Sequence, residues 1–153
     1  MLAVNAMRLE KGYPAWGMDL TTERTPLESG LQAFVKTEGR EFTGKAAVLK
    51  RQQQQPWQLT LLEIDNPNGP TFGGQPVYLD DQVVGIVTSG AYGHRTHKNL
   101  ALAYLVDTKL PLALRERGPG GEGDLVVKIL GQSHTAKILN HPPYDPQNQR
   151  LKA

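Results

Sequence analysis

The chain has 153 residues, of which 39% are hydrophobic and 21% charged, so it is long enough for one main domain and has the composition of a globular protein. Its 17 lysines and arginines and 15 acidic residues are scattered singly, which excludes the basic stripe that nucleic acid binding requires. It has no cysteine and no apolar run near the ~18 residues of a membrane-spanning helix, so we predict a cytoplasmic protein, or a mitochondrial-matrix protein in a eukaryote, with neither nucleic acid nor membrane as partner.

The first predicted element is a short helix from Leu2 to Lys11, which Gly12 ends. A helix of this length is marginal alone, and its apolar side needs a larger surface. We therefore expect that the natural protein continues upstream of this segment. The stretch from Gly12 to Gly30, rich in Gly, Pro and Thr, predicts a structured loop of the kind that forms sites.

Three shorter features follow the loop. Leu31 to Lys36 reads as a short strand, and Thr43 is a candidate N-cap for a helix that runs through Lys50. The glutamine run from Gln52 to Gln55, followed by Pro56, is typical of a linker. Another unit is therefore expected to begin after residue 55.

The chain after Pro56 is predicted to be all β. Asp80-Asp81 suggests a tight hairpin and Gly131-Gln132 a reversal between the last two strands, and closure into a barrel or sandwich would remove exposed edges. The short strand-like runs are Trp57 to Ile64, Pro76 to Leu79, Val83 to Ser89, Leu100 to Val106, Leu125 to Leu130 and Thr135 to Leu139.

Other site chemistries have little support in the pattern. The glycine-rich stretch from Arg115 to Gly123 reads as a mobile loop, because it has neither P-loop spacing nor a following helix. His94 and His97 lack a third metal ligand nearby, and no Ser-His-Asp or paired-carboxylate arrangement can be argued.

Several motifs resemble the glycine cleavage T-protein (aminomethyltransferase) superfamily, and the resemblance extends over nearly the whole chain. The motifs run from Met7 to Gly17, at Asp19-Leu20, and from Thr25 to Leu31, Phe42 to Ala47, Gly85 to Gly90 and Lys98 to Tyr104. The ending from His141 to Lys152 is similar to the end of sarcosine and dimethylglycine dehydrogenases, which favours the flavin-dependent branch.

The resemblance implies a mainly β fold, with a small C-terminal β-barrel at residues 56–153. Residues 1–55 would be the C-terminal remnant of an α/β folate-binding domain. It also implies that the chain is the C-terminal part of a tetrahydrofolate-dependent module. The module receives a one-carbon unit from an N-methyl amine, and FAD on an upstream domain or subunit oxidises that amine. The family's catalytic aspartate and pterin-binding glutamate lie upstream of the matched region, so no catalytic residue is assigned and the chain is incomplete as an enzyme.

Four residues are candidates for binding the folate. Tyr13 falls on the family tyrosine close to folate and could stack on its flat ring, and Trp16 could wall the same cavity. Glu10 and its neighbour Lys11 could contact the folate tail, and Arg95, in a basic cluster with His94, His97 and Lys98, suits the carboxylates of a polyglutamyl tail. Plain alternatives remain for all four: a half-buried loop tyrosine, a packing tryptophan, a solvated pair at a helix end and a solvated hairpin.

Two other functions stay open at this point. The β-unit could serve only to dock domains or subunits, with the folate cavity elsewhere. The chain could also be a folate-binding relative that acts outside glycine cleavage, in iron-sulfur maintenance or transfer RNA modification, although the absence of cysteine and the Asp-Pro tail argue against this.

Overall fold

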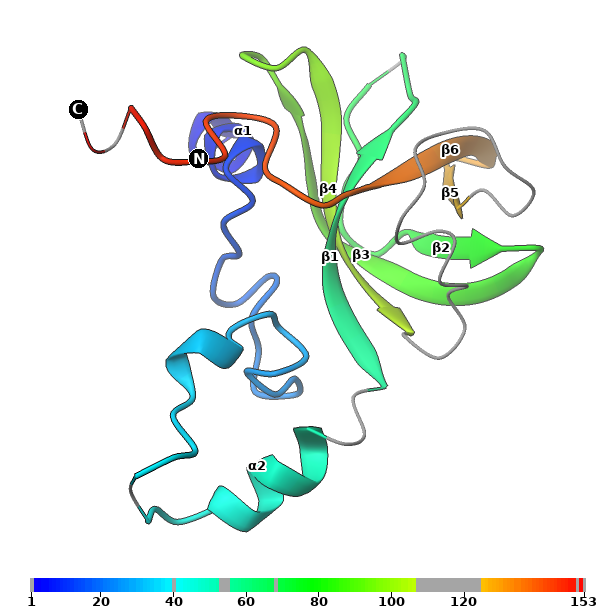
Figure 1. Cartoon of the computed structure of the whole chain (residues 1–153). Coiled ribbons are helices and arrows are strands. Elements are labelled where there is room, and N and C mark those ends of the chain that lie inside the picture. The colour runs from blue at the N-terminus through cyan, green and yellow to red at the C-terminus, as the bar shows by residue number, and fades with distance from the viewer. Residues whose placement is uncertain are drawn as a thin grey trace.

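The computed structural model describes residues 2–39, 41–52, 56–67, 69–106, 125–150 and 152 (Figure 1). None of the helices in these ranges is long and apolar enough to cross a membrane. In chain order the elements are α1 (Leu2–Glu10), a 3-10 turn η1 (Gln32–Phe34), α2 (Lys45–Gln52), β1 (Trp57–Ile64), β2 (Pro76–Leu79), β3 (Gln82–Gly93), β4 (Lys98–Val106), β5 (Leu125–Ile129) and β6 (Gln132–Leu139).

The six strands close into a barrel in the order β1-β4-β3-β2-β5-β6, and neighbouring strands run antiparallel. Closure pairs each strand on both sides and so removes the exposed edges of an open sheet. The predicted mainly β fold with a small barrel is confirmed. The strands lie where the sequence predicts them, although β3 extends to Gly93 and β6 begins already at Gln132.

Two hairpin turns follow from residues that adopt positive φ. Asp80 and Asp81, with φ of 47° and 61°, join β2 to β3 in the mirror-image geometry that two-residue hairpins prefer, as predicted. Between β5 and β6 the turn residues are Leu130 and Gly131, with φ of 49° and 80°. The predicted reversal at Gly131-Gln132 is therefore one residue too late, because Gln132 already pairs with Ile129.

The barrel is filled by the inward-facing side chains of its strands, among them Leu62, Val77, Val87, Leu105 and Val127. Strand β4 is buried on both faces along almost its whole length. Its odd-numbered residues from Ala101 to Leu105 face the barrel interior, while Leu100 and Leu102 belong to a second cluster outside it.

The second cluster lies between the barrel and α1. Leu9 of α1 is fully buried against Leu61 of β1 and Leu100 and Leu102 of β4. The predicted helix is confirmed, although it ends at Glu10, and Gly12 after it has a φ of 66°, the left-handed conformation that commonly follows a helix. In Figure 1, α1 lies beside the upper part of the barrel, with the C-terminal segment running past it.

The segment between α1 and the barrel departs from the prediction. The strand predicted from Leu31 to Lys36 is wrong, because the chain forms the 3-10 turn η1 there, with Phe34 N donating to the Leu31 carbonyl. A strand needs a free sheet edge, and the closed barrel offers none. The predicted helix is present as α2, but it begins at Lys45, and Gly44 rather than Thr43 accepts the first helical hydrogen bond, from Val48.

Two predicted segments cannot be compared fully. Gln52, expected in a linker, is the last residue of α2, and residues 53–55 lie outside the described residues. The glycine-rich segment from Arg115 to Gly123 also lies outside them.

Candidate functional site

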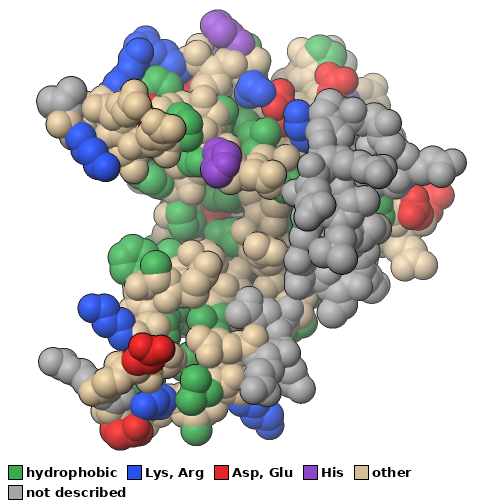
Figure 2. All heavy atoms as spheres, in the orientation of Figure 1, with side chains coloured by type: hydrophobic (Ala, Val, Ile, Leu, Met, Phe, Trp, Pro, Cys, Tyr) green, Lys and Arg blue, Asp and Glu red, His purple; other side chains and the backbone are tan. Residues whose placement is uncertain are grey.

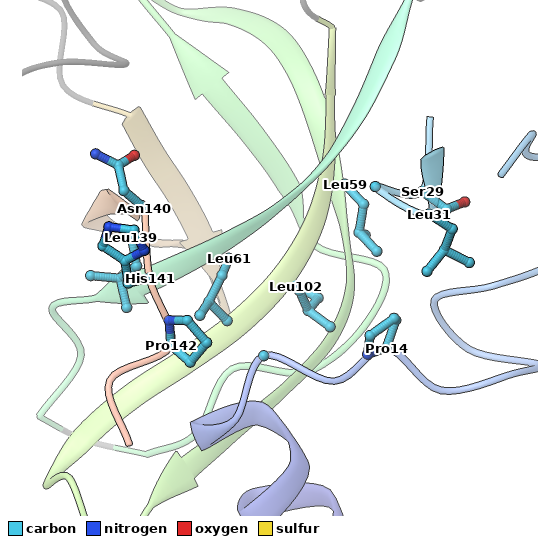
Figure 3. Close-up of a pocket in the computed structure, with 12 residues that line it drawn as sticks. Pro14, Ser29, Leu31, Leu59, Leu61, Leu102, Leu139, Asn140, His141 and Pro142 are labelled. Carbon is cyan, nitrogen blue, oxygen red and sulfur yellow. The ribbon is translucent and has the colours of Figure 1, made fainter. Parts of the chain in front are cut away.

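An apolar cleft of about 330 Å³ lies on the outer face of the barrel. Its floor consists of leucines from β1, β4 and the end of β6, which face the loop carrying Pro14 and the tail carrying Pro142 (Figure 3). Figure 2 shows this side of the molecule hollowed between the α1 region and the α2 region, with hydrophobic side chains in the recess. The lining residues are Gly12, Pro14, Ser29, Gly30, Leu31, Leu59, Leu61, Leu102, Leu139, Asn140, His141 and Pro142.

The walls of the cleft are held by contacts between the two ends of the chain. Lys11 Nζ donates to the Asp145 carbonyl at 2.7 Å and to Asn148 Oδ1 at 2.6 Å. Tyr144 N donates to the Glu10 carbonyl at 3.1 Å. A Cβ added to Gly12 would meet Pro142 Cγ at 3.4 Å, an ordinary contact, so glycine is favoured here by its φ of 66° and not by lack of space.

The polar groups of the cleft come from Ser29, Asn140 and His141. Such a site, mostly apolar with a few polar groups at its margin, suits a flat, largely hydrophobic ligand. Within the described ranges there is no group of three His, Cys, Asp or Glu side chains that could hold a metal ion. His94 and His97 therefore remain without a third ligand there.

Tyr13 and Trp16 lie on the loop that follows α1, with 49% and 74% of their surface exposed. Neither is among the cleft-lining residues, although Gly12 and Pro14 on either side of Tyr13 are. Lys11 Nζ lies 5.9 Å from the centre of the Tyr13 ring. Tyr13 thus lies between two cleft-lining residues, and both aromatic side chains are exposed to solvent.

Asp19, whose side chain is fully buried, holds this loop against the barrel. Its Oδ2 accepts hydrogen bonds from Arg8 Nη1 at 2.6 Å and Ala15 N at 2.8 Å, and its Oδ1 accepts from Thr88 Oγ1 at 2.5 Å and Ser89 Oγ at 2.6 Å. A buried carboxylate needs such partners, because an unpaired charge in the interior is strongly disfavoured.

Tyr104 of β4 extends this polar network. Its hydroxyl donates to the Asp19 carbonyl at 2.9 Å and is hydrogen-bonded to Ser29 Oγ at 2.8 Å. Burial raises the pKa of the Tyr104 phenol above its ordinary value, while the hydrogen bond to Ser29 and the Arg24 charge oppose this rise. The Arg24 guanidinium lies 4.9 Å from the Tyr104 ring and 4.3 Å from that of Trp57.

The structure brings Glu10 and Arg95 together. Glu10 is only 5% exposed, and its Oε1 accepts hydrogen bonds from the backbone N–H groups of Arg95 and Thr96, each at 2.8 Å. Glu10 thus fixes the hairpin between β3 and β4. The Arg95 guanidinium is exposed and lies 6.0 Å from the Tyr144 ring. Contact of either residue with folate stays a prediction.

Sequence reasoning missed Asp19 and most of the cleft lining. In the sequence, Asp19 is only a single acidic residue between Met18 and Leu20, within one of the motifs that resemble the family. The residues of the cleft come from segments far apart in the chain, and only the fold brings Ser29 and His141 to one surface.

Residues 58–145 match the family model described as the glycine cleavage T-protein C-terminal barrel domain. Over 98% of its length the chain is 34% identical to human mitochondrial dimethylglycine dehydrogenase, and it spans 17% of that protein. Over 95% of its length it is 36% identical to the aminomethyltransferase of Halalkalibacterium halodurans, of which it spans 38%.

Among solved structures, the glycine cleavage system aminomethyltransferase T from Bartonella henselae superposes with a TM-score of 0.78, at 23% identity. The superposition covers 94% of this chain and 38% of that protein, and at this identity it supports the fold alone. The chain therefore spans well under half the length of each of these relatives.

Proposed function

Because the chain belongs to the glycine cleavage T-protein family, through its C-terminal barrel domain, we propose that it forms the C-terminal part of a tetrahydrofolate-dependent one-carbon transfer module. The module resembles that of sarcosine and dimethylglycine dehydrogenases. The observation that carries the proposal is the apolar cleft beside a hydrogen-bonded loop that exposes Tyr13 and Trp16.

The residues around the cleft fit a folate. Its benzoyl ring and the pyrimidine ring of its pterin are flat, and an exposed tyrosine or tryptophan can stack on their faces. Tyr13 and Trp16 are the residues proposed to hold the rings. Arg95, an exposed cation, suits a glutamate carboxylate, and Glu10 keeps the Arg95 backbone in place. When bound, tetrahydrofolate supplies the chemistry by taking up the one-carbon unit as its 5,10-methylene form.

The natural partners in this proposal are folate-binding and flavin domains or subunits that precede the chain. Residues 1–55 would complete the folate domain and residues 56–153 form its C-terminal barrel. FAD on the preceding part would oxidise an N-methyl amine, whose carbon then passes to tetrahydrofolate. A mitochondrial-matrix location in a eukaryote is proposed from the mitochondrial relatives, and a cytoplasmic one otherwise.

The test is tetrahydrofolate binding by the protein together with its proposed preceding domains, measured by isothermal titration calorimetry. Replacing Tyr13 by alanine is expected to weaken binding roughly 2- to 13-fold, the equivalent of ~0.5–1.5 kcal/mol of stacking energy. Tyr92→Ala is the matched control, because Tyr92 is a comparably exposed tyrosine on β3. Equal affinities of Tyr13→Ala and the unaltered protein would contradict a folate role for Tyr13.

A second candidate function is docking without folate contact. It is favoured by α1, where the exposed side chains of Val4 and Met7, three residues apart, share one face and Leu2 is exposed as well. Exposed apolar side chains gathered on one helix face are typical of an interaction surface. A pure docking module predicts that Tyr13→Ala leaves folate affinity unchanged, whereas Met7→Glu disrupts association with the preceding domains.

A further inference from the structure

Asp19 joins four parts of the molecule through one buried side chain and its own backbone. Oδ2 is bound to Arg8 of α1 and to the backbone of Ala15 in the loop, whereas Oδ1 is bound to Thr88 and Ser89 of β3. The Asp19 carbonyl accepts from Tyr104 of β4. The carboxylate therefore stands between the loop and the barrel.

A β-bulge in β3 makes this arrangement possible. In a regular strand, adjacent side chains point to opposite faces. The pairing of β3 with β4 shifts between Val87 and Ser89, so that Thr88 has no partner in the register. The bulge allows the hydroxyls of Thr88 and Ser89 to reach the same carboxylate oxygen, and bulges commonly redirect side chains in this way.

The same contacts fix the backbone that carries the two aromatic residues. Arg8 Nη1, which binds Asp19, also donates to the Tyr13 carbonyl at 3.0 Å, and Tyr13 N donates to the Arg8 carbonyl at 2.8 Å. Asp19 N and Leu20 N both donate to the Ala15 carbonyl, and Gly17 N donates to the Leu20 carbonyl at 2.8 Å. The loop from Tyr13 to Leu20 is thus closed on itself around Asp19.

We infer that Asp19 is the positioning residue of the site: its carboxylate, held by Arg8 on one side and the β3 bulge on the other, fixes the loop that presents Tyr13 and Trp16. Asp19 is fully buried and does not itself reach the cleft surface. The inference rests on the proposed function only because that function gives Tyr13 and Trp16 a ligand. The rigidity of the loop is a property of the chain itself.

The experiment compares Asp19→Asn and Asp19→Ala with the unaltered chain by hydrogen exchange under native conditions. Asparagine keeps the shape but lacks the charge that pairs with Arg8, and alanine removes both side-chain acceptors. Val127→Ala is the control, because it opens a cavity inside the barrel away from the loop. Asp19→Ala should speed hydrogen exchange of the backbone amides of residues 15–20 about tenfold or more relative to the barrel amides, and Asp19→Asn should do so to a smaller extent.

The control should instead speed exchange of barrel and loop amides together. If Asp19→Asn and any folded Asp19→Ala protein left the loop amides as protected as in the unaltered chain, or shifted loop and barrel amides in parallel, the positioning role would be refuted. Tetrahydrofolate titration of the same variants, in the protein with its preceding domains, separates the two claims. Loss of loop protection with no folate binding by any form would refute the proposed function and leave the positioning role standing.

Discussion

Replacing Tyr104 by phenylalanine removes one oxygen atom from the centre of the buried polar network. The ring remains in place, but the Asp19 carbonyl and Ser29 Oγ each lose a hydrogen-bond partner. A buried neutral hydrogen bond contributes about 1 kcal/mol, and an acceptor left unpaired costs ~1–3 kcal/mol. Ser29 can then direct its single hydroxyl proton to the Thr25 carbonyl, so the main loss is at the Asp19 carbonyl, and we expect the free energy of unfolding to fall by ~1–3 kcal/mol.

Urea unfolding at neutral pH, followed by far-UV circular dichroism, measures this loss. In a thermal scan it corresponds to a lower midpoint by roughly 2–12 °C for a chain of this length. Tyr92→Phe is the control, because no hydrogen bond of the Tyr92 hydroxyl is found among the described residues, and it should change stability by less than about 0.5 kcal/mol. If Tyr104→Phe were as stable as this control, the network would not contribute to folding as argued.

The same variant gives a prediction about pH. Burial raises the pKa of Tyr104 in the folded protein, so above the unfolded pKa near 10 the folded state holds a proton that the unfolded state has lost. The stability that depends on this proton is complete below pH 10 and declines as the pH rises further. The stability difference between the unaltered protein and Tyr104→Phe should therefore be constant below pH 10 and narrow as the pH rises above 10, and a difference that stayed constant above pH 10 would contradict the assignment.

Three other substitutions test the barrel. Leu62→Ala, at a fully buried position inside the barrel, should lower the free energy of unfolding by ~2–5 kcal/mol in urea titrations. Gly90→Ala should destabilise by ~2 kcal/mol or more, seen as a lower thermal midpoint, because its Cβ would lie 2.2 Å from the Thr71 carbonyl oxygen. Lys98→Ala should cost less than about 1 kcal/mol by urea titration, because its 2.5 Å ion pair with Glu63 is about one-third exposed, and a larger loss would show that the pair is less screened than its exposure indicates.

The barrel was the part most open to prediction. The alternation of apolar residues indicates strands, and turn-forming pairs such as Asp80-Asp81 indicate hairpins. Both signals are local, because a strand has a side-chain period of two and a tight turn depends on the positive φ of its own residues. The segment from Leu31 to Lys36 has the composition of a strand as well. It is not one because pairing depends on a free edge elsewhere in the fold, which no local pattern encodes.

The site was less predictable, because its side chains are defined by distant partners. Glu10 looks like a solvated charge at a helix end, yet its carboxylate binds Arg95 N, 85 residues away. Asp19 likewise binds Ser89, 70 residues along the chain, through a bulge that the alternating pattern of β3 conceals. Tyr13 and Trp16 are candidates through the family resemblance, and only the structure shows that the loop carrying them is tied to the barrel.

The bond between Lys11 and Asp145 joins residues 134 positions apart. During synthesis, Lys11 leaves the ribosome long before Asp145 and Asn148 have been translated, so its hydrogen bonds to these two residues cannot form until both have been made. At an elongation rate of about 5–20 residues per second, the delay between synthesis of Lys11 and of Asp145 is several seconds or longer. The wall of the cleft beside Gly12 and Pro142 can therefore be completed only after all six strands of the barrel have been translated.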